Sequence, residues 1–209
     1  MEITKEKEAD ALSLPIPIYK AVRIGKAISR DKEDFIIYAG LSEELVSLLR
    51  EHSLDPADSE IQNKTADRAR FGLGLYEDWY VKGRLPFVLV HEESGALAAI
   101  VWFGPKVVGR KSLNKLSLEE RKESEILMDP ANWHTLAYRS YPPFRGKGLM
   151  KGFTKFAMDI YDQYHPKARY WTGLDANNLP SLRLAEALGF RISDEASDES
   201  AHWLVMIKK

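Results

Sequence analysis

The sequence predicts a mixed α/β fold, of either the α/β or the α+β class, in which helices lie on a sheet. Three observations predict it. The first half contains β-rich runs and a hairpin pattern, and the second half reads strand, helix, strand, helix, strand, strand. The 209 residues are 44% hydrophobic, which is enough for one domain with a substantial core and no structural disulfide or metal.

Residues 1–13 alternate acidic and basic side chains, so we predict a solvated tail there, followed by a single domain over 14–209. After the tail, two strand-like runs precede a helix that Ser42 can cap, and leucines recur in that helix at helical spacing. A second helical stretch is broken by glycines. These elements are strands at 16–28 and 35–38, a helix from Ser42, and a helical stretch at 58–83 broken near Gly72 and Gly74.

A hairpin is the clearest local pattern of the first half. Two β-rich runs, 85–90 and 97–103, flank a turn at 91–95. Residues 105–132 then form a charged excursion, and a capping-box pattern at 117–120 predicts a helix inside it. An excursion of this length is either a segment that contacts substrate or a solvated insertion.

The second half has sharper boundaries. An amphipathic helix follows a strand, and a later helix stops at Gly189, the usual kind of residue for a left-handed C-cap. The predicted elements are strands at 134–141, 170–174, 191–193 and 202–207, and helices at 148–164 and 178–188.

The composition excludes several classes of protein. Because the chain has no cysteine, it has no thiol nucleophile, disulfide, iron–sulfur cluster or cysteine-based zinc site. A net charge of −1 argues against a protein that coats nucleic acid. No stretch is apolar for long enough to span a membrane, and the N-terminus is not a signal peptide, so we predict a cytoplasmic protein. The five histidines are scattered, and no metal site is predicted.

One stretch predicts a phosphate-binding turn. After a strand and two prolines, the basic run Arg145-Gly146-Lys147-Gly148 leads directly into the amphipathic helix. The first turn of a helix has backbone N–H groups without intrahelical partners and the positive end of the helix dipole, and glycines let a ligand approach that backbone. Lys147, Lys151 and Lys155 add a cationic stripe along the helix. The alternative is a plain glycine turn followed by a solvated lysine face.

The same stretch resembles the acyl-CoA signature of the GCN5-related N-acetyltransferases (the GNAT family), Arg/Gln-x-x-Gly-x-Gly/Ala, in Arg145-Gly146-Lys147-Gly148-Leu149-Met150. Residues 178–190, from Asn178 to Gly189-Phe190, are similar to the family's Asn-x-x-Ala/Ser…Leu-Gly-Phe helix. The two motifs occur in the family's order and spacing, and the resemblance covers residues 133–209. It implies a mostly antiparallel central sheet flanked by helices.

The resemblance also implies direct transfer of an acetyl group from acetyl-CoA to an amine, without a covalent enzyme intermediate. The donor phosphates would bind the backbone of the six signature residues, Arg145, Gly146, Lys147, Gly148, Leu149 and Met150. The family stabilises the thioester oxygen from the backbone of the preceding strand, where Tyr138, Arg139 and Ser140 are the matching positions. Asn178 resembles the family's cofactor-side asparagine, and it is equally suited to cap its own helix.

The sequence departs from the family at two positions. Met150 stands where Gly or Ala is usual, which narrows the space beside the diphosphate but keeps its backbone N–H. Ala185 replaces the tyrosine with which many members protonate the leaving thiolate. Ser181 or a water would then supply that proton, or the thiolate leaves unaided.

His134 is the candidate general base, because it lies on the strand before the signature, where some relatives carry a catalytic Glu or His. An imidazole titrates close to neutral pH, as this role requires. Tyr138, Tyr141 and Glu125 are weaker candidates. The alternative for His134 is a polar side chain whose hydrogen bonds are satisfied at the start of a strand.

The sequence gives little indication of which amine accepts the acetyl group. Residues 76–80, Tyr-Glu-Asp-Trp-Tyr, offer carboxylates and aromatic rings to a cation, but they equally match an ordinary helix with buried aromatic residues. An antibiotic, an amino acid, a polyamine and a protein N-terminus all remain open as acceptors. The alternatives to acetyl transfer are a non-catalytic acyl-CoA sensor or scaffold of the same fold, and an acyltransferase for longer chains. We expect a monomer or a homodimer.

Overall fold

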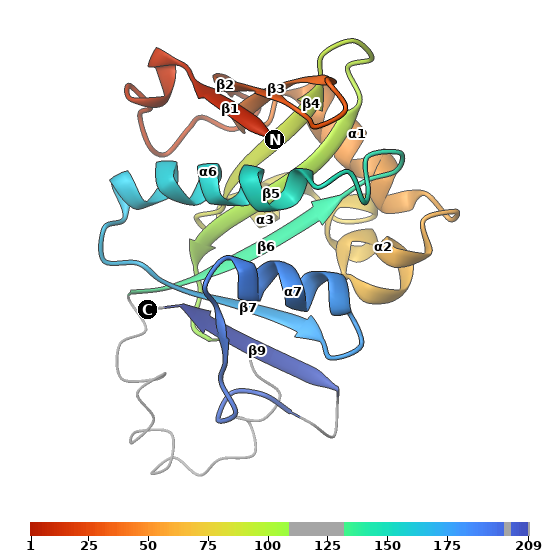
Figure 1. The fold of residues 1–209 in the computed structure, drawn as a ribbon, viewed down its shortest axis with the longest axis vertical. Coiled ribbons are helices and arrows are strands. Elements are labelled where there is room, and N and C mark those ends of the chain that lie inside the picture. The colour runs from red at the N-terminus through yellow and green to blue at the C-terminus, as the bar shows by residue number, and fades with distance from the viewer. Residues whose placement is uncertain (109–131, 199–201, 209) are drawn as a thin grey trace. The chain divides into compact units, whose positions relative to one another are not determined.

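The secondary structure follows the predicted order closely (Figure 1). The computed structural model describes residues 1–108, 132–198 and 202–208. The chain divides into two compact units, Met1–Trp102 with Tyr138–Ile160 and Phe103–Ala137 with Tyr161–Lys209. The predicted charged excursion falls largely on 109–131, so its helix at 117–120 and the candidate base Glu125 lie outside the described residues.

The first unit combines an antiparallel sheet with short helices. Neighbouring strands pair antiparallel from β1 to β4, and β5 follows β4 in the sheet. The strands are β1 (Glu2–Lys5), β2 (Ala21–Ile28), β3 (Asp34–Gly40), β4 (Leu85–His91) and β5 (Leu97–Pro105), the last of which ends in the second unit. The helices are the 3-10 turn η1 (Lys7–Ala9), α1 (Glu43–Leu54), α2 (Ser59–Lys64), the π-helical turn η2 (Arg68–Gly72) and α3 (Tyr76–Tyr80).

Two predictions at the N-terminus are wrong. The solvated tail at 1–13 instead contains β1, which pairs with β2 from Glu2↔Ile28 to Lys5↔Gly25, and the turn η1, whose Ala9 is fully buried. The strand predicted from residue 16 begins only at Ala21. Pro15 and Pro17 lack the N–H that a strand ladder needs, which explains why the ladder starts after them.

The second unit is built on the strands that follow. These are β6 (Trp133–Ser140), which ends in the first unit, β7 (Arg169–Asp175), β8 (Arg191–Ile192) and β9 (Trp203–Lys208). β7 and β8 each pair antiparallel with β9, whereas β6 and β7 pair in parallel. The helix α7 (Leu179–Ala187) is capped by Asn178, and Gly189 adopts the predicted left-handed conformation with φ of 87°. The predicted mixed α/β fold with a mostly antiparallel sheet is confirmed.

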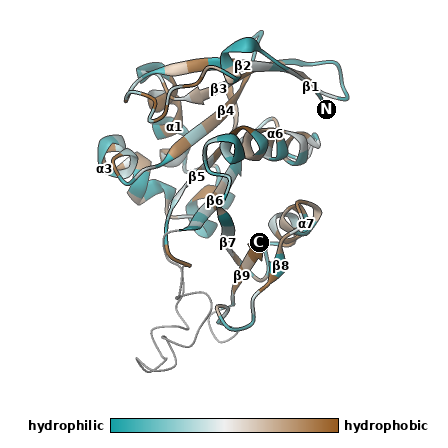
Figure 2. Cartoon of the chain, turned by 90° about the vertical axis from the view of Figure 1, so that its left-hand side faces the viewer, coloured by the Kyte–Doolittle hydropathy of each residue, from teal (hydrophilic) through white to brown (hydrophobic). Residues whose placement is uncertain are grey.

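The helix α6 (Leu149–Tyr164) is amphipathic, as its spacing predicts, and Figure 2 shows hydrophobic and hydrophilic residues mixed along it. Within the first unit, Figures 1 and 2 show α1 and α3 on one face of the strands and α6 on the other. Phe153 and Ala157 on α6 are fully buried, whereas Lys151 and Lys155 are exposed. No helix among the described residues is both long and apolar enough to cross a membrane.

Candidate functional site

The predicted phosphate-binding turn joins β6 to α6 in the first unit. After β6 ends, the Tyr141 N–H donates to the Ala98 carbonyl oxygen at 2.9 Å, which fastens the start of the turn to β5. Gly146 and Gly148 have φ of 78° and 71°, and a Cβ added at either position would meet no atom within 4 Å. This backbone conformation favours glycine at both positions, and both face open space at the start of α6.

The side chain of Arg145 is half-buried and is held by a buried carboxylate. Its Nε donates to the Ser140 carbonyl oxygen at 2.8 Å, and its two terminal nitrogens donate to the Asp58 carboxylate at 2.7 and 2.6 Å. The Asp58 side chain is 1% exposed, and it also caps α2 by accepting from the Ile61 N–H at 3.2 Å. The Arg145 side chain thus links the turn to β6 and α2, and the Asp58 carboxylate neutralises its charge.

Asp58 remains ionised despite its burial. Desolvation raises the pKa of its carboxyl group, but hydrogen bonds from Arg145 and from the Ile61 N–H outweigh it, so the pKa lies below its ordinary value. A carboxyl group whose pKa is lower in the folded state stabilises the fold above its unfolded-state pKa. That stabilisation is lost as the pH falls through the folded-state pKa.

We therefore expect Asp58→Asn to be less stable than the wild type at neutral pH, by about 3 kcal/mol, because it leaves a buried ion pair broken. Below about pH 4, the usual pKa of an aspartate in an unfolded chain, the difference should shrink, since the unfolded wild type then binds a proton that folded Asp58 resists. Urea unfolding at pH 6 and pH 3 measures this. Glu60→Gln, which removes an exposed carboxylate from α2, is the control and should change little at either pH. A difference that stays constant with pH would contradict the assignment.

The predicted cationic stripe is largely neutralised. Lys147 Nζ lies 2.5 Å from Glu33 Oε1, and Lys155 pairs with Asp159 on the next turn of α6. Lys151 is exposed and has no ion-pair partner among the described residues. The predicted stripe is therefore not a dense cluster of free lysines, and the feature of this turn that faces open space is its glycine backbone.

The last residues of β6 are also anchored by a buried carboxylate. Arg139 donates from Nε to Asp67 at 2.5 Å and from one terminal nitrogen to Asp67 at 3.0 Å. Its other terminal nitrogen donates to the Tyr138 carbonyl oxygen at 2.7 Å, and its guanidinium lies 5.0 Å from the centre of the Trp102 ring. Together with the Arg145 contact to the Ser140 carbonyl, these bonds fix the backbone at the predicted thioester positions Tyr138, Arg139 and Ser140.

The parallel ladder between β6 and β7 is short. It contains three residue pairs, from Trp133↔Arg169 to Thr135↔Trp171. Leu136 and Ala137, the next residues of β6 in the second unit, have no ladder partner on β7. The backbone of β6 in this unit is therefore not paired with β7 beyond Thr135.

The candidate base His134 lies in the second unit within an aromatic cluster. Its side chain is buried, and Nδ1 lies 2.6 Å from the phenol oxygen of Tyr161. His165 lies against both, with ring centroids 4.3 Å from Tyr161 and 5.1 Å from His134. Burial lowers the pKa of His165, and the Asp162 carboxylate partly opposes this. The contact with Tyr161 fits the alternative in which His134 is a polar side chain with its hydrogen bond satisfied. It fits a base equally, because the Tyr161 hydroxyl can fix the tautomer of the His134 ring.

The other predicted residues of the second unit lie at the start of α7. Asn178 Oδ1 accepts from the Ser181 N–H at 3.3 Å, so Asn178 is the helix cap that the sequence allows. Ser181 is half-buried in the first turn, and Ala185 is fully buried on the same helix. The structure thus groups the signature turn and residues 138–140 in one unit, and His134, Asn178 and Ser181 in the other.

Two further candidates are poorly suited to their roles. Tyr141 is fully buried, and burial raises the pKa of its phenol, so it does not fit a base. In the predicted cation-binding run, Tyr76 and Trp79 are buried, their rings pack on each other at 5.5 Å, and Glu77 accepts a hydrogen bond from the Tyr19 hydroxyl. These contacts favour the alternative of an ordinary helix with buried aromatic residues.

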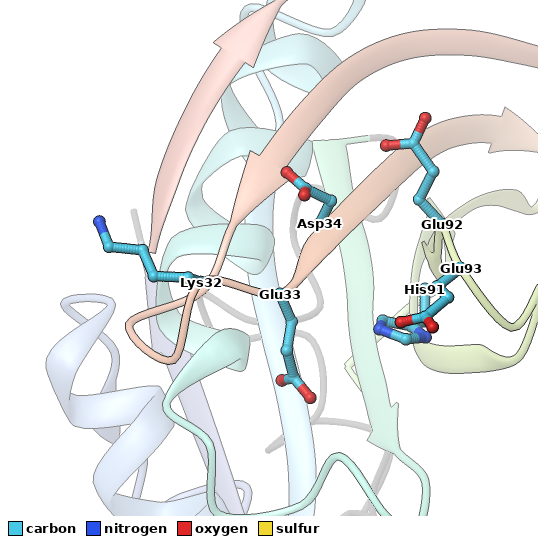
Figure 3. Close-up of a pocket in the computed structure, with 6 residues that line it drawn as sticks. All are labelled: Lys32, Glu33, Asp34, His91, Glu92 and Glu93. Atoms are coloured by element: carbon cyan, nitrogen blue, oxygen red, sulfur yellow. The ribbon is translucent and has the colours of Figure 1, made fainter.

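A shallow depression of about 360 Å³ borders the partner of Lys147 (Figure 3). Its lining comes from the β2–β3 turn and from the end of β4 with the turn that follows: Lys32, Glu33, Asp34, His91, Glu92 and Glu93. Four of these six residues are carboxylates, so the depression is unsuited to phosphate. No three His, Asp or Glu residues in the described part of the chain are grouped to bind a metal ion.

Three residues of the site have no signal in the sequence. Asp58, Asp67 and Glu33 lie 87, 72 and 114 residues before their partners Arg145, Arg139 and Lys147. Each is one acidic residue among many, and none belongs to a motif. Only the folded chain brings them to the turn.

No family model and no curated protein sequence matches the chain. Its fold matches solved structures over 79–93% of its length. The GNAT domain of S. lividans PAT has a TM-score of 0.59 and 10% identity, with 92% of this chain and 98% of that chain covered. A putative GnaT-family acetyltransferase from Bordetella pertussis has a TM-score of 0.54 and 18% identity, with 93% and 100% covered. The aminoglycoside acetyltransferase AAC(6')-Ib, in complex with coenzyme A and kanamycin, has a TM-score of 0.51 and 14% identity, with 79% and 87% covered. The chain therefore has the GNAT fold.

Proposed function

We propose that this protein is an acyl-CoA-dependent N-acyltransferase that transfers an acetyl group from acetyl-CoA to an amine. The observation that carries the proposal is the turn between β6 and α6, where Gly146 and Gly148 adopt positive φ and face open space at a helix N-terminus. On a GNAT fold, this is the position of the acyl-CoA signature. AAC(6')-Ib, which has a similar fold, is a structure with coenzyme A bound.

The donor would be held by backbone rather than by side chains. The N–H groups of Arg145, Gly146, Lys147, Gly148, Leu149 and Met150 face the diphosphate, and the α6 dipole adds attraction. Lys151 is exposed one turn further along and can add a screened attraction. The pantetheine and thioester would lie along β6 beyond Thr135, where the ladder to β7 has ended.

The chemistry is a direct attack. The amine nitrogen attacks the thioester carbonyl carbon, the carbon–sulfur bond breaks, and CoA leaves as a thiolate. Backbone N–H groups among Tyr138, Arg139 and Ser140 stabilise the charge that develops on the carbonyl oxygen. His134 takes the amine proton. Ser181 or a water protonates the thiolate, because Ala185 has no acidic group.

A non-catalytic acyl-CoA sensor of the same fold is the second candidate. One observation favours it, namely that Ala185 is fully buried and offers no acid at the position where the resemblance implies a tyrosine. A sensor would bind acetyl-CoA tightly and turn over no amine. An acyltransferase for longer chains would instead prefer long acyl donors.

One assay separates these functions. Release of free CoA from acetyl-CoA is followed across a panel of aminoglycosides, amino acids, polyamines and peptides with a free N-terminus, with binding of acetyl-CoA measured in parallel by calorimetry. We expect saturable binding, and CoA release that depends on at least one class of amine. Binding without turnover on any amine supports the sensor. The absence of binding to acetyl-CoA and to longer acyl-CoA donors would refute both.

A further inference from the structure

We propose that the segment 58–67 is a clamp on the acyl-CoA site, in which Asp58 positions the diphosphate turn through Arg145 and Asp67 positions the thioester end of β6 through Arg139. The inference rests on the proposed function and deepens it. Both carboxylates are positioning residues, since each acts through an arginine. The two carboxylates act on different parts of the site, because Arg145 lies in the turn and Arg139 lies on β6.

The Asp58 contact is specific to the turn. Two terminal nitrogens of Arg145 bind the two carboxylate oxygens of Asp58 at 2.7 and 2.6 Å, while Nε of the same arginine binds the Ser140 carbonyl. All three contacts orient one planar guanidinium. Arg145 directly precedes Gly146, so a rotated guanidinium would shift the backbone N–H groups proposed to meet the diphosphate.

The Asp67 contact is specific to the strand. Its carboxylate is fully buried and accepts from Arg139 at 2.5 and 3.0 Å and from Arg70 at 2.8 Å. Arg139 and Arg70 lie over the Trp102 ring, at 5.0 and 5.7 Å from its centre. Arg139 in turn donates to the Tyr138 carbonyl, so Asp67 determines where the backbone of the predicted oxyanion site lies.

The Asp67–Arg139 and Asp58–Arg145 ion pairs hold the two ends of one short connection. Residues 139–145 run from the end of β6 to the glycine turn, and both of their ion pairs lead back to the segment that contains α2. The side chains of Asp58 and Asp67 are each 1% exposed, so water does not replace either arginine as the partner of its carboxylate. Within α2 itself, the Asp58 cap fixes the helix start, and Thr65 Oγ1 bonds the Ile61 carbonyl at 2.8 Å near its end.

The division of roles gives two different kinetic signatures. Asp58→Asn should weaken acetyl-CoA binding about tenfold or more, with kcat within about threefold of the wild type, because the turn contacts parts of the donor remote from the reaction. Asp67→Asn should lower kcat about tenfold or more with acetyl-CoA affinity nearly unchanged, because the oxyanion donors matter in the transition state. A general loss of packing would move both parameters in both variants.

The experiment measures acetyl-CoA affinity by calorimetry and kcat with the best amine of the panel, at one temperature below the unfolding of every variant. Glu60→Gln is the matched control, because it makes the same carboxylate-to-amide change on α2 at a side chain paired only with Lys64 on the surface. It should leave both parameters unchanged. If an Asp→Asn variant does not fold, Arg145→Lys and Arg139→Lys replace it, since each keeps the charge but loses the paired hydrogen bonds.

Opposite signatures in the two variants support the clamp. Equal changes in both parameters, or values that match the control, overturn it while acetyl-CoA turnover by the wild type still stands. A wild type that neither binds nor consumes acetyl-CoA refutes the proposed function itself. The two failures are therefore distinguishable.

Discussion

Gly148→Asp is expected to abolish acetyl-CoA binding while the protein still folds. Gly148 has φ of 71°, and an added Cβ meets no protein atom within 4 Å, so the new carboxylate points into the space proposed for the diphosphate. Aspartate tolerates the left-handed region better than most residues, which limits the cost to folding. Two like charges about 4 Å apart repel by several kcal/mol at a protein surface, so we expect affinity to fall at least about 100-fold.

The hairpin turn after β4 supplies a matched control. Gly95 has φ of 69° and also has no atom within 4 Å of an added Cβ, so Gly95→Asp imposes the same backbone strain and the same charge. Thermal unfolding should shift equally in the two variants, and calorimetry should show lost acetyl-CoA binding only in Gly148→Asp. Affinity within about threefold of the wild type in Gly148→Asp would place the diphosphate elsewhere.

Local signals account for the parts of the fold that the sequence predicted well. Ser42 and Asn178 cap α1 and α7 because their side chains reach an N–H three residues ahead, and Gly189 ends α7 because it adopts positive φ. The burial of Phe153 on α6 follows from the spacing of apolar residues. Each of these is decided within a few residues along the chain.

The parts that the sequence missed depend on distant partners. β1 forms because residues 2–5 pair with the edge of β2. Four residues are too few for their own sequence pattern to predict a strand. Likewise, Arg145 looks like a phosphate ligand until the fold brings Asp58 against it. Asp58 neutralises the Arg145 side chain, so the proposed phosphate site depends on backbone N–H groups, which the amino-acid composition does not reveal.

His134→Gln is expected to lower kcat by about 100-fold or more and to remove the acid limb of its pH profile, because a positioned base contributes about 10²–10⁴ to the rate. The contact between His134 and Tyr161 adds a second variant to this test. Nδ1 lies 2.6 Å from the Tyr161 phenol, so a base at Nε2 requires that Nδ1 keep its proton and donate it to Tyr161.

Tyr161→Phe removes the phenol that lies against Nδ1 and keeps the ring, and it should lower kcat by about tenfold while the acid limb persists, since His134 is still there to titrate. His202→Gln makes the same substitution at an exposed histidine of the second unit and controls for the change of residue type. Stopped assays of kcat between pH 5 and pH 9, with thermal unfolding of each variant, separate the two roles of His134. A side chain that is only structural would lower the unfolding temperature in both variants and leave kcat and its pH profile as in the wild type. A base would change the profile in His134→Gln alone, because no other residue then takes up the amine proton over the same pH range.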